Sequence, residues 1–147
     1  LSCLVMGTND LVKDLRARHT PGRGEVLVAL ATVLLAARAN GLAALDGAHA
    51  DLSDEAGVEA ACRQGRDLGF DGKTLVHPRT IEAANRLFAP APEEVALARR
   101  VIAAHAEAVA VGKGVAVVDG RLVEALHVED ARRVVALADA IAARAGA

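Results

Sequence analysis

The chain has 147 residues, of which 53% are hydrophobic and 24% charged, a length that suits one globular domain. This composition excludes intrinsic disorder, collagen and low-complexity repeats. A net charge of -2, with two Phe and no Trp or Tyr, provides neither the basic field nor the stacking platforms of a nucleic-acid-binding protein. We therefore expect an Ala-rich α or α/β protein without a nucleic-acid partner.

Neither the cysteines nor the apolar segments indicate export or membrane insertion. Cys3 and Cys62 lie far apart without a CxxC spacing, which favours reduced thiols in the cytoplasm. The most apolar stretch, residues 26–39, contains Arg38 and is shorter than the roughly 20 residues that a membrane span needs. The sequence thus predicts a cytoplasmic protein without a membrane partner. Because it opens at Leu1 rather than Met, we expect a processed chain or a piece of a longer one.

Apolar runs alternate with helical stretches along the first part of the chain. Strands joined by crossover helices pair in parallel, so we expect a parallel α/β sheet with right-handed connections. The predicted strands are 1–6, 42–45 and 74–76. The predicted helices are 25–40, 51–68 with Ser53 as N-cap and Gly69 as C-cap, and 80–88, while 13–24 is predicted to be an exposed and mobile loop.

The remainder of the chain predicts a helix, a hairpin and a second helix. Asp119-Gly120 between two apolar runs is typical of a type I′ turn. We assign residues 1–90 to the strand-containing part and 91–147 to an extension. The elements predicted for the extension are a helix at 92–110, strands at 115–118 and 121–123, and a helix at 128–143.

Polar side chains follow all three predicted strands. Asp10, Asp46 and His77 come after the first, second and third strand. Reactive groups of parallel α/β folds gather beyond the carboxyl ends of the strands, so we expect these residues at one edge of the sheet. A single strand-end Asp or His is more often a cap or a structural residue. Three together favour a functional site.

Each of these positions has a functional and a structural interpretation. The turn Gly7-Thr8-Asn9 leaves the Asp10 carboxylate exposed, as a hard oxygen ligand suited to Mg²⁺, but Asp10 could instead cap the turn. Asp46 shares its loop with His49 and Asp51, where substrate contact and loop capping both stay open.

The third strand raises a similar question at each of its ends. Pro78 holds His77 extended, which suits either a substrate contact or a structural role. Lys73 precedes the third predicted strand, so we expect it at the opposite edge of the sheet, with a structural role.

Four segments carry a resemblance to a known family. They are GTNDL at 7–11, LDGAHAD at 45–51, GFDGKTLVHPRTI at 69–81 and FAPAPEEV at 88–95. Together they resemble the citrate lyase beta subunit family, also called the HpcH/HpaI aldolase superfamily, which includes malyl-CoA and citramalyl-CoA lyases. The resemblance covers nearly the whole chain.

The resemblance implies a (β/α)₈ TIM barrel enzyme that binds an acyl-CoA thioester and Mg²⁺. Such an enzyme cleaves a 3-hydroxyacyl-CoA of the citryl-CoA or malyl-CoA type into acetyl-CoA and an oxo acid. A base removes the hydroxyl proton, and Mg²⁺ polarises the carbonyl or alkoxide oxygen. A Glu and an Asp hold the metal in this family, and Asp10 matches the Asp. The substrate-binding residues that we expect are Gly7, Thr8, Asn9, Asp46 and His77.

The chain also departs from the pattern of the family it resembles. Family members are much longer, and their metal-binding Glu and substrate-gripping Arg match no residue from Leu1 onward. Three strands cannot close a barrel of eight. We therefore expect the carboxyl-terminal half, with strands six to eight, a helix and a β-hairpin tail. Alone it would expose sheet edges and apolar helix faces.

The hairpin tail contains a second departure. Several relatives have a DGxxxDxP motif whose later Asp reaches a neighbouring subunit. The resemblance and this tail suggest a homo-oligomer, a trimer or hexamer, although the oligomeric state stays open. Here Asp119-Gly120 leads to Glu124, with Leu126 at the position of the Pro. A catalytic role for Glu124 and a solvent-facing position in the hairpin both stay open.

Two other interpretations compete with the lyase. A non-catalytic half-barrel that needs an amino-terminal partner is compatible with the same resemblance. A phospho-receiver domain has a similar length, but it needs an acidic pair at the first strand and a Lys after a strand. Asp10 has no acidic neighbour, and Lys73 is predicted to open its strand.

Overall fold

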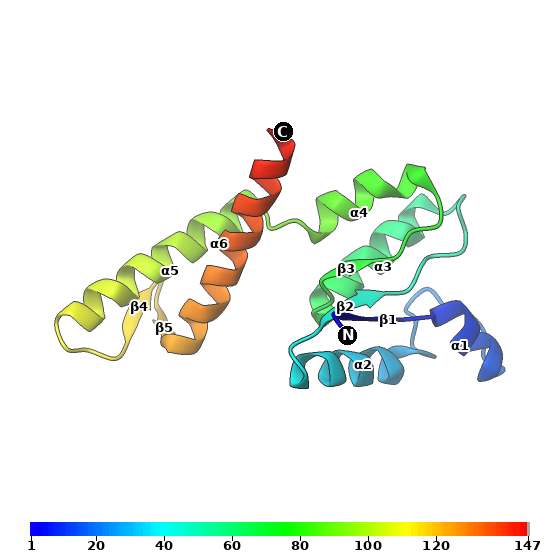
Figure 1. Cartoon of the computed structure of the whole chain (residues 1–147), viewed down its shortest axis with the longest axis horizontal. Helices are drawn as coiled ribbons and strands as arrows, with labels where there is room; N and C mark the ends of the chain where they lie inside the picture. The colour runs from blue at the N-terminus through cyan, green and yellow to red at the C-terminus, as the bar shows by residue number, and fades with distance from the viewer. Residues whose placement is uncertain (147) are drawn as a thin grey trace. The chain divides into compact units, whose positions relative to one another are not determined.

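The chain forms two compact units, Leu1–Phe88 and Ala89–Ala147, in a computed structural model that describes residues 1–146 (Figure 1). Each unit buries apolar residues of its own. The boundary predicted from the sequence falls at residue 90. A length that suits one domain is thus divided into a unit with a parallel sheet and a smaller unit with a hairpin.

The first unit contains a parallel sheet of three strands in the order β1-β2-β3. Cys3 lies opposite Ala43, and Asp46 lies opposite Lys73. Helices connect the parallel strands, as the sequence predicts. The elements are β1 (Cys3–Val5), α1 (Thr8–Asp14), α2 (Leu27–Ala39), β2 (Ala43–Asp46), α3 (Glu55–Leu68), β3 (Gly72–Lys73), the 3₁₀ helix η1 (Pro78–Thr80) and α4 (Ile81–Phe88).

Helix α2 supplies much of the core of the first unit. Leu30, Leu34 and Ala37 lie on one face of the helix and are buried against apolar residues of the sheet. Val28 and Leu35 lie outside this core and are 80% and 74% exposed. The predicted exposure of apolar helix surface is therefore confirmed on α2.

Strand β1 is shorter and less buried than predicted. It lies at one edge of the sheet and pairs only with β2. Leu1 and Val5 are exposed, so the apolar run at the amino end is not buried on both faces. The physical reason is that alternate residues of a strand point to opposite faces: Leu4 and Met6 pack with the core cluster of α2, whereas Val5 points to the other face.

Helix α3 begins later than predicted because Asp54, and not Ser53, is its N-cap. The Asp54 Oδ1 accepts a hydrogen bond of 2.9 Å from the Gly57 N–H. Ser53 instead donates to the Asp51 carboxylate. The C-cap is confirmed. Gly69 has a backbone φ of 106°, a conformation that residues with a Cβ rarely adopt.

The third strand is displaced from its predicted position. The Thr74 N–H and Oγ1 both donate to the Asp46 carbonyl oxygen, at 2.9 and 3.1 Å, and β3 ends at Lys73. Leu75 packs against the apolar cluster of α3 and α4, while Val76 is exposed. These apolar residues therefore lie beyond the strand. Lys73 closes the strand rather than opening it, so its predicted place at the opposite sheet edge is wrong.

The second unit consists of α5 (Pro92–Ala110), β4 (Ala116–Val118), β5 (Arg121–Val123) and α6 (Ala125–Ala145). The two helices pack along each other, with the hairpin between them in the sequence (Figure 1). Asp119 and Gly120 have φ of 49° and 76°, the left-handed pair that a type I′ turn requires. The predicted hairpin is confirmed. Helix α6 starts earlier than predicted, because Glu124 is its N-cap.

Replacing Gly69 by Ala tests the C-cap of α3. A Cβ in the left-handed conformation costs about 1 to 2 kcal/mol, so G69A should lower the free energy of unfolding by this amount in urea titrations. Gly24→Ala is the matched control, since Gly24 has no positive φ and its added Cβ would meet nothing within 4 Å. Equal effects of the two substitutions would contradict the assignment.

Candidate functional site

A cavity of about 570 Å³ lies at the carboxyl ends of the strands in the first unit. Its walls come from the start of α1, the loop before α2, the loop after β2 and the first turns of α3. Chemistry-bearing side chains on these walls include Thr8, Asn9, Arg23, His49, Asp54 and Lys73. The location is the edge of the sheet at which the sequence predicts a site.

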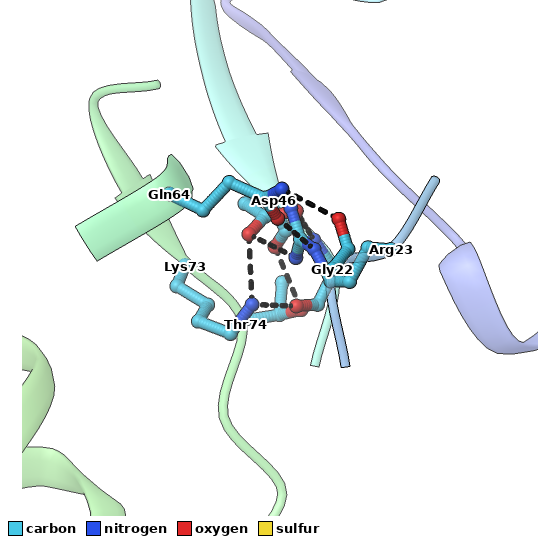
Figure 2. Close-up of polar contacts among 7 residues, drawn as sticks. Gly22, Arg23, Asp46, Gln64, Lys73 and Thr74 are labelled. Atoms are coloured by element: carbon cyan, nitrogen blue, oxygen red, sulfur yellow. Dashed lines mark hydrogen bonds and ion pairs between the residues drawn. The ribbon is translucent and has the colours of Figure 1, made fainter. Parts of the chain in front are cut away.

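A buried ion group joins two residues of this cavity, Arg23 and Lys73, to Asp46 (Figure 2). Asp46 Oδ2 accepts hydrogen bonds from Arg23 Nη1 at 2.7 Å and from Lys73 Nζ at 2.8 Å. The Asp46 and Lys73 side chains are 0% and 1% exposed, and that of Arg23 is 13% exposed. We call Arg23, Asp46 and Lys73 the Asp46 group. It joins the ends of β2 and β3 to the loop before α2.

The remaining polar atoms of Asp46 and Lys73 are also satisfied. Asp46 Oδ1 accepts from the Gly47 N–H at 2.7 Å, and Lys73 Nζ donates a second hydrogen bond to the Gly47 carbonyl oxygen. A Cβ on Gly65 would lie 2.9 Å from Asp46 Oδ2, so α3 packs directly over the carboxylate. Only glycine at this position leaves room for the Asp46 group.

Arg23 is held in place from both sides. Its Nε donates to Gln64 Oε1 at 2.7 Å, and Gln64 Nε2 donates to the Gly22 carbonyl oxygen at 2.8 Å (Figure 2). Arg23 has φ 52°, a conformation that costs a residue with a Cβ about 1 to 2 kcal/mol. These contacts offset that cost. The loop that we predicted to be exposed and mobile is therefore fixed at Arg23.

The Asp46 group carries more positive than negative charge when Lys73 is protonated. Two cations share one carboxylate, and Arg23 Nη2 is buried without a hydrogen-bond partner among residues 1–146. Burial lowers the pKa of Lys73, although the Asp46 charge and hydrogen bond act in the opposite direction. An uncompensated buried cation is costly, so an anionic or strongly polar ligand group would be stabilised here.

Asp10 lies in the first turn of α1, with its side chain exposed. The turn predicted at 7–10 is thus the start of a helix, with Gly7 as the N-cap. Within the described part of the chain, the Asp10 carboxylate makes no hydrogen bond or ion pair. Thr8 and Asn9, its neighbours, line the cavity, and a Cβ on Gly47 would overlap the Thr8 side chain. The end of β1 therefore meets the end of β2 at this site.

The donor set fits one ligand position of a Mg²⁺ ion. A free, exposed carboxylate is the hard oxygen ligand that Mg²⁺ prefers, and this ion commonly takes one or two protein carboxylates. Across residues 1–146, no three His, Cys, Asp or Glu side chains converge in a way that could hold a metal. Asp10 would therefore serve as one ligand beside oxygen atoms from other sources.

His77 and Glu124 lie elsewhere. His77 does not follow the third strand directly; it is the N-cap of η1, and its Nδ1 accepts a hydrogen bond of 3.2 Å from the Arg79 N–H. It does not line the cavity. Glu124 is in the second unit, where its side chain is exposed and its backbone N–H donates to His127 Nδ1 at 3.1 Å. Their roles in the site stay predictions.

Arg23 and Lys73 belong to the site, although the sequence patterns did not predict them there. To predict the place of Lys73, the third strand would have to be assigned to the pair Gly72-Lys73. The apolar pattern instead favoured a strand at 74–76. For Arg23, no local pattern indicates a partner that lies 23 positions away in the sequence. Of the predicted residues, Thr8 and Asn9 line the cavity, while Asp46 is buried and bonds to Arg23 and Lys73, which line it.

A smaller cavity of about 260 Å³ lies between α3 and α4. Two of its charged residues, Arg86 and Glu59, form an ion pair of 2.6 Å, and Arg79 donates to the Leu52 carbonyl oxygen. None of the predicted site residues lines it. These contacts fit a structural role.

Parallel strands, helical connections and a cavity beyond the strand ends define an α/β protein with the site placement of TIM-barrel enzymes. Residues 1–78 match the HpcH/HpaI aldolase/citrate lyase family, and the chain belongs to this family. The family resemblance noted in the sequence is thereby confirmed.

Individual relatives agree with this assignment. The chain is 54% identical over 143 residues to the (3S)-malyl-CoA thioesterase of Cereibacter sphaeroides, covering 97% of this chain and 50% of that protein. It is 37% identical over 136 residues to the citrate lyase subunit beta of Escherichia coli, covering 92% of this chain and 45% of that protein. The chain spans about half the length of the curated relatives it matches.

A solved structure has a similar fold. The protein CitE of Mycobacterium tuberculosis, in complex with magnesium, acetoacetate and coenzyme A, matches with a TM-score of 0.77 and 30% sequence identity. The match covers 92% of this chain and 51% of that one. The fold is therefore mixed α/β and corresponds to part of a citrate lyase-like protein.

Family membership also bears on the phospho-receiver interpretation of the sequence. Lys73 ends its strand, so its predicted position at the start of the strand, which spoke against a phospho-receiver domain, is wrong. The family match nevertheless removes the support for a receiver.

No helix within residues 1–146 is long and apolar enough to cross a membrane.

Replacing Asp46 by Ala should destabilise the fold strongly. The change leaves Lys73 and Arg23 buried without their counter-ion, which costs about 3 to 5 kcal/mol in the free energy of unfolding. Lys73→Met is the matched comparison, because Asp46 then keeps its hydrogen bonds from Arg23 and the Gly47 N–H. Urea titrations of both variants measure the difference. A smaller loss for Asp46→Ala than for Lys73→Met would contradict the role of Asp46.

The lowered pKa of Lys73 predicts a dependence of stability on pH. Because the pKa of Lys73 in the folded protein lies below its ordinary value of 10.5, Lys73 binds its proton more tightly in the unfolded chain than in the folded one. Between the lowered pKa and 10.5, the unfolded state holds more protons, so the contribution of Lys73 to stability rises with pH. The free energy of unfolding of the wild type, minus that of Lys73→Met, should increase as the pH approaches 10.5. A difference that falls with pH would refute the direction.

Proposed function

We propose that the protein acts on the CoA thioester of a 3-hydroxy acid, of the malyl-CoA or citryl-CoA type, with Mg²⁺ as cofactor. The observation that carries this proposal is the cavity at the strand ends, with its buried cationic Asp46 group and the unbonded Arg23 Nη2. Such a group would stabilise a carboxylate or a polarised carbonyl oxygen of the acyl part. Membership in the family and the magnesium and coenzyme A in the related CitE complex support the same substrate class.

Asp10 is proposed as a Mg²⁺ ligand, and the residues beside it as substrate contacts. Bound Mg²⁺ would polarise the carbonyl or alkoxide oxygen of the substrate. Thr8 and Asn9 line the cavity next to Asp10 and would orient the hydroxy acid. Gly7 and His77 remain proposed contacts from the family resemblance alone.

The first candidate reaction is cleavage of a carbon-carbon bond. A base removes the proton of the 3-hydroxyl group, the bond between carbons 2 and 3 breaks, and acetyl-CoA and an oxo acid are formed. The citrate lyase relatives support this reaction, as does the CitE complex with acetoacetate and coenzyme A.

The second candidate reaction is hydrolysis of the thioester. The relative with 54% identity over 97% of this chain is a (3S)-malyl-CoA thioesterase, and this similarity specifically favours hydrolysis. Both reactions start from the same class of substrate, and their products differ. The non-catalytic half-barrel is the less favoured alternative, since the matched relatives include enzymes.

The assembly is proposed from the family resemblance, and the location from the cysteine pattern of the sequence. We propose a homo-oligomer, a trimer or hexamer, in the cytoplasm. In such an assembly Glu124 would take the place of the tail Asp and act in the site of a neighbouring subunit. Its exposed side chain at the N-cap of α6 is compatible with such a contact.

A direct assay tests the proposal. The intact protein is incubated with Mg²⁺ and either (3S)-malyl-CoA or citryl-CoA, and the products are separated by chromatography. The two reactions of (3S)-malyl-CoA are distinguished by their products. Acetyl-CoA with glyoxylate indicates carbon-carbon cleavage, while malate with free CoA indicates hydrolysis. Conversion of neither malyl-CoA nor citryl-CoA would refute the proposed substrate class.

Asp10→Asn should abolish the Mg²⁺-dependent reaction and leave the fold intact. The variant loses the charged oxygen ligand, while its exposed side chain makes no contact that the fold needs. Product formation and circular dichroism are the measurements. Asp14→Asn, an exposed carboxylate on the same helix, is the control. Full activity of Asp10→Asn would remove Asp10 from the metal site.

A further inference from the structure

His49 and Asp54 form a pair on the wall of the cavity, separate from the Asp46 group. Both line the cavity, and the His49 side chain keeps 24% exposure. His49 Nε2 is buried and has no hydrogen-bond partner in the described residues, and Asp54 Oδ2 lies 3.6 Å from it. A small rotation of the ring would convert this contact into a hydrogen bond. Catalytic pairs are often loose in the absence of a ligand.

The Asp54 carboxylate is held by the start of α3. Its Oδ1 accepts the N-cap hydrogen bond from the Gly57 N–H at 2.9 Å, which leaves Oδ2 toward His49. Nε2 therefore faces the carboxylate, and Nδ1 is the ring nitrogen available to a water molecule or substrate. The two oxygens of Asp54 thus have different tasks.

Gly57 makes the close approach of His49 and Asp54 to α3 possible. A Cβ at this position would overlap the Asp54 carboxylate and lie 2.9 Å from His49 Cε1. Glycine inside a helix costs about 1 kcal/mol relative to Ala. Gly57 therefore lowers the stability of α3 but leaves space for the side chains of His49 and Asp54.

We infer that His49, oriented by Asp54, is the base that activates water for hydrolysis of the thioester. The inference rests on the proposed action on a 3-hydroxyacyl-CoA and assigns a residue to its hydrolytic reaction. Its basis is the geometry of a His-carboxylate pair with one ring nitrogen toward the carboxylate, in a cavity of sufficient size for an acyl group.

The proposed step balances without any further reactant. Nδ1 takes a proton from water while the water oxygen bonds to the thioester carbonyl carbon. The carbon-sulfur bond then breaks, and the CoA thiolate receives the proton from His49. The products are the free hydroxy acid, which loses its carboxyl proton to solvent, and CoA as a thiol.

Kinetics of three variants of the intact protein with (3S)-malyl-CoA test this inference. A general base contributes about 100-fold or more, so His49→Gln should lower kcat for release of malate and CoA by at least this factor, with a much smaller change in KM. Asp54→Asn keeps an N-cap side chain but loses the carboxylate charge, and should lower kcat about 10-fold or more. His105→Gln, on α5 in the other unit, is the control for a His substitution.

Chemical rescue separates proton transfer from a structural role. Imidazole added to His49→Ala should restore part of the hydrolysis rate, because it supplies the missing base, and should not restore a variant damaged in its fold. Lack of rescue together with a normal kcat in His49→Gln would overturn the inference.

The product pattern of the wild type distinguishes this inference from the proposed function. If the protein forms acetyl-CoA and glyoxylate alone, the proposed substrate class stands and the role of His49 is refuted. If it converts neither malyl-CoA nor citryl-CoA, both are refuted. Malate and CoA from the wild type, lost in His49→Gln and regained by His49→Ala with imidazole, support both.

Discussion

The buried carboxylate of Asp46 is the interaction on which the site depends. It is fully buried, and it attracts one cation from the end of β3 and another from the loop before α2. A buried ion group is weak evidence for net stability, since desolvation opposes the attraction between the charges. Its clearer effect is on geometry: Lys73 and Arg23 can each reach Oδ2 only if strand, loop and helix take the observed positions. The main contribution of the Asp46 group is therefore to fix the relative positions of these strands, the loop and the helix.

Charge in the cavity follows from the same arrangement. The two cations satisfy one carboxylate and leave Arg23 Nη2 without a partner in the described chain, and Arg23 lines the same cavity as Thr8 and Asn9. His49 and Asp54 lie on another wall of this cavity. Binding of an anionic acyl group and activation of water would thus use separate sets of residues. This separation agrees with a family whose members include both lyase subunits and a thioesterase.

Much of the fold could be predicted from the sequence, because local patterns determine it. The apolar run and Gly stop of β2, the cap at Gly69 and the Asp119-Gly120 turn all produced the expected elements. The third strand could not be placed, since its two residues are held by contacts of Lys73 and Thr74 with Asp46 rather than by an apolar pattern. Asp46 followed from its place at a strand end, and Thr8 and Asn9 from the family resemblance. Arg23 did not, because its contacts are distant in the sequence.

Those distant contacts have a consequence for how binding and folding are linked. Arg23 and Lys73 lie 23 and 27 positions from Asp46. Their shared site therefore exists only when the whole sheet unit is assembled, and an unfolded chain offers a ligand no equivalent. Mass action then requires that any anion held by Arg23 stabilises the folded unit, and raises its melting temperature, by an amount that grows with the logarithm of its concentration relative to its dissociation constant. Ligand binding in the cavity and folding of the unit are thus linked equilibria. A supply of substrate would therefore also protect the protein from thermal inactivation.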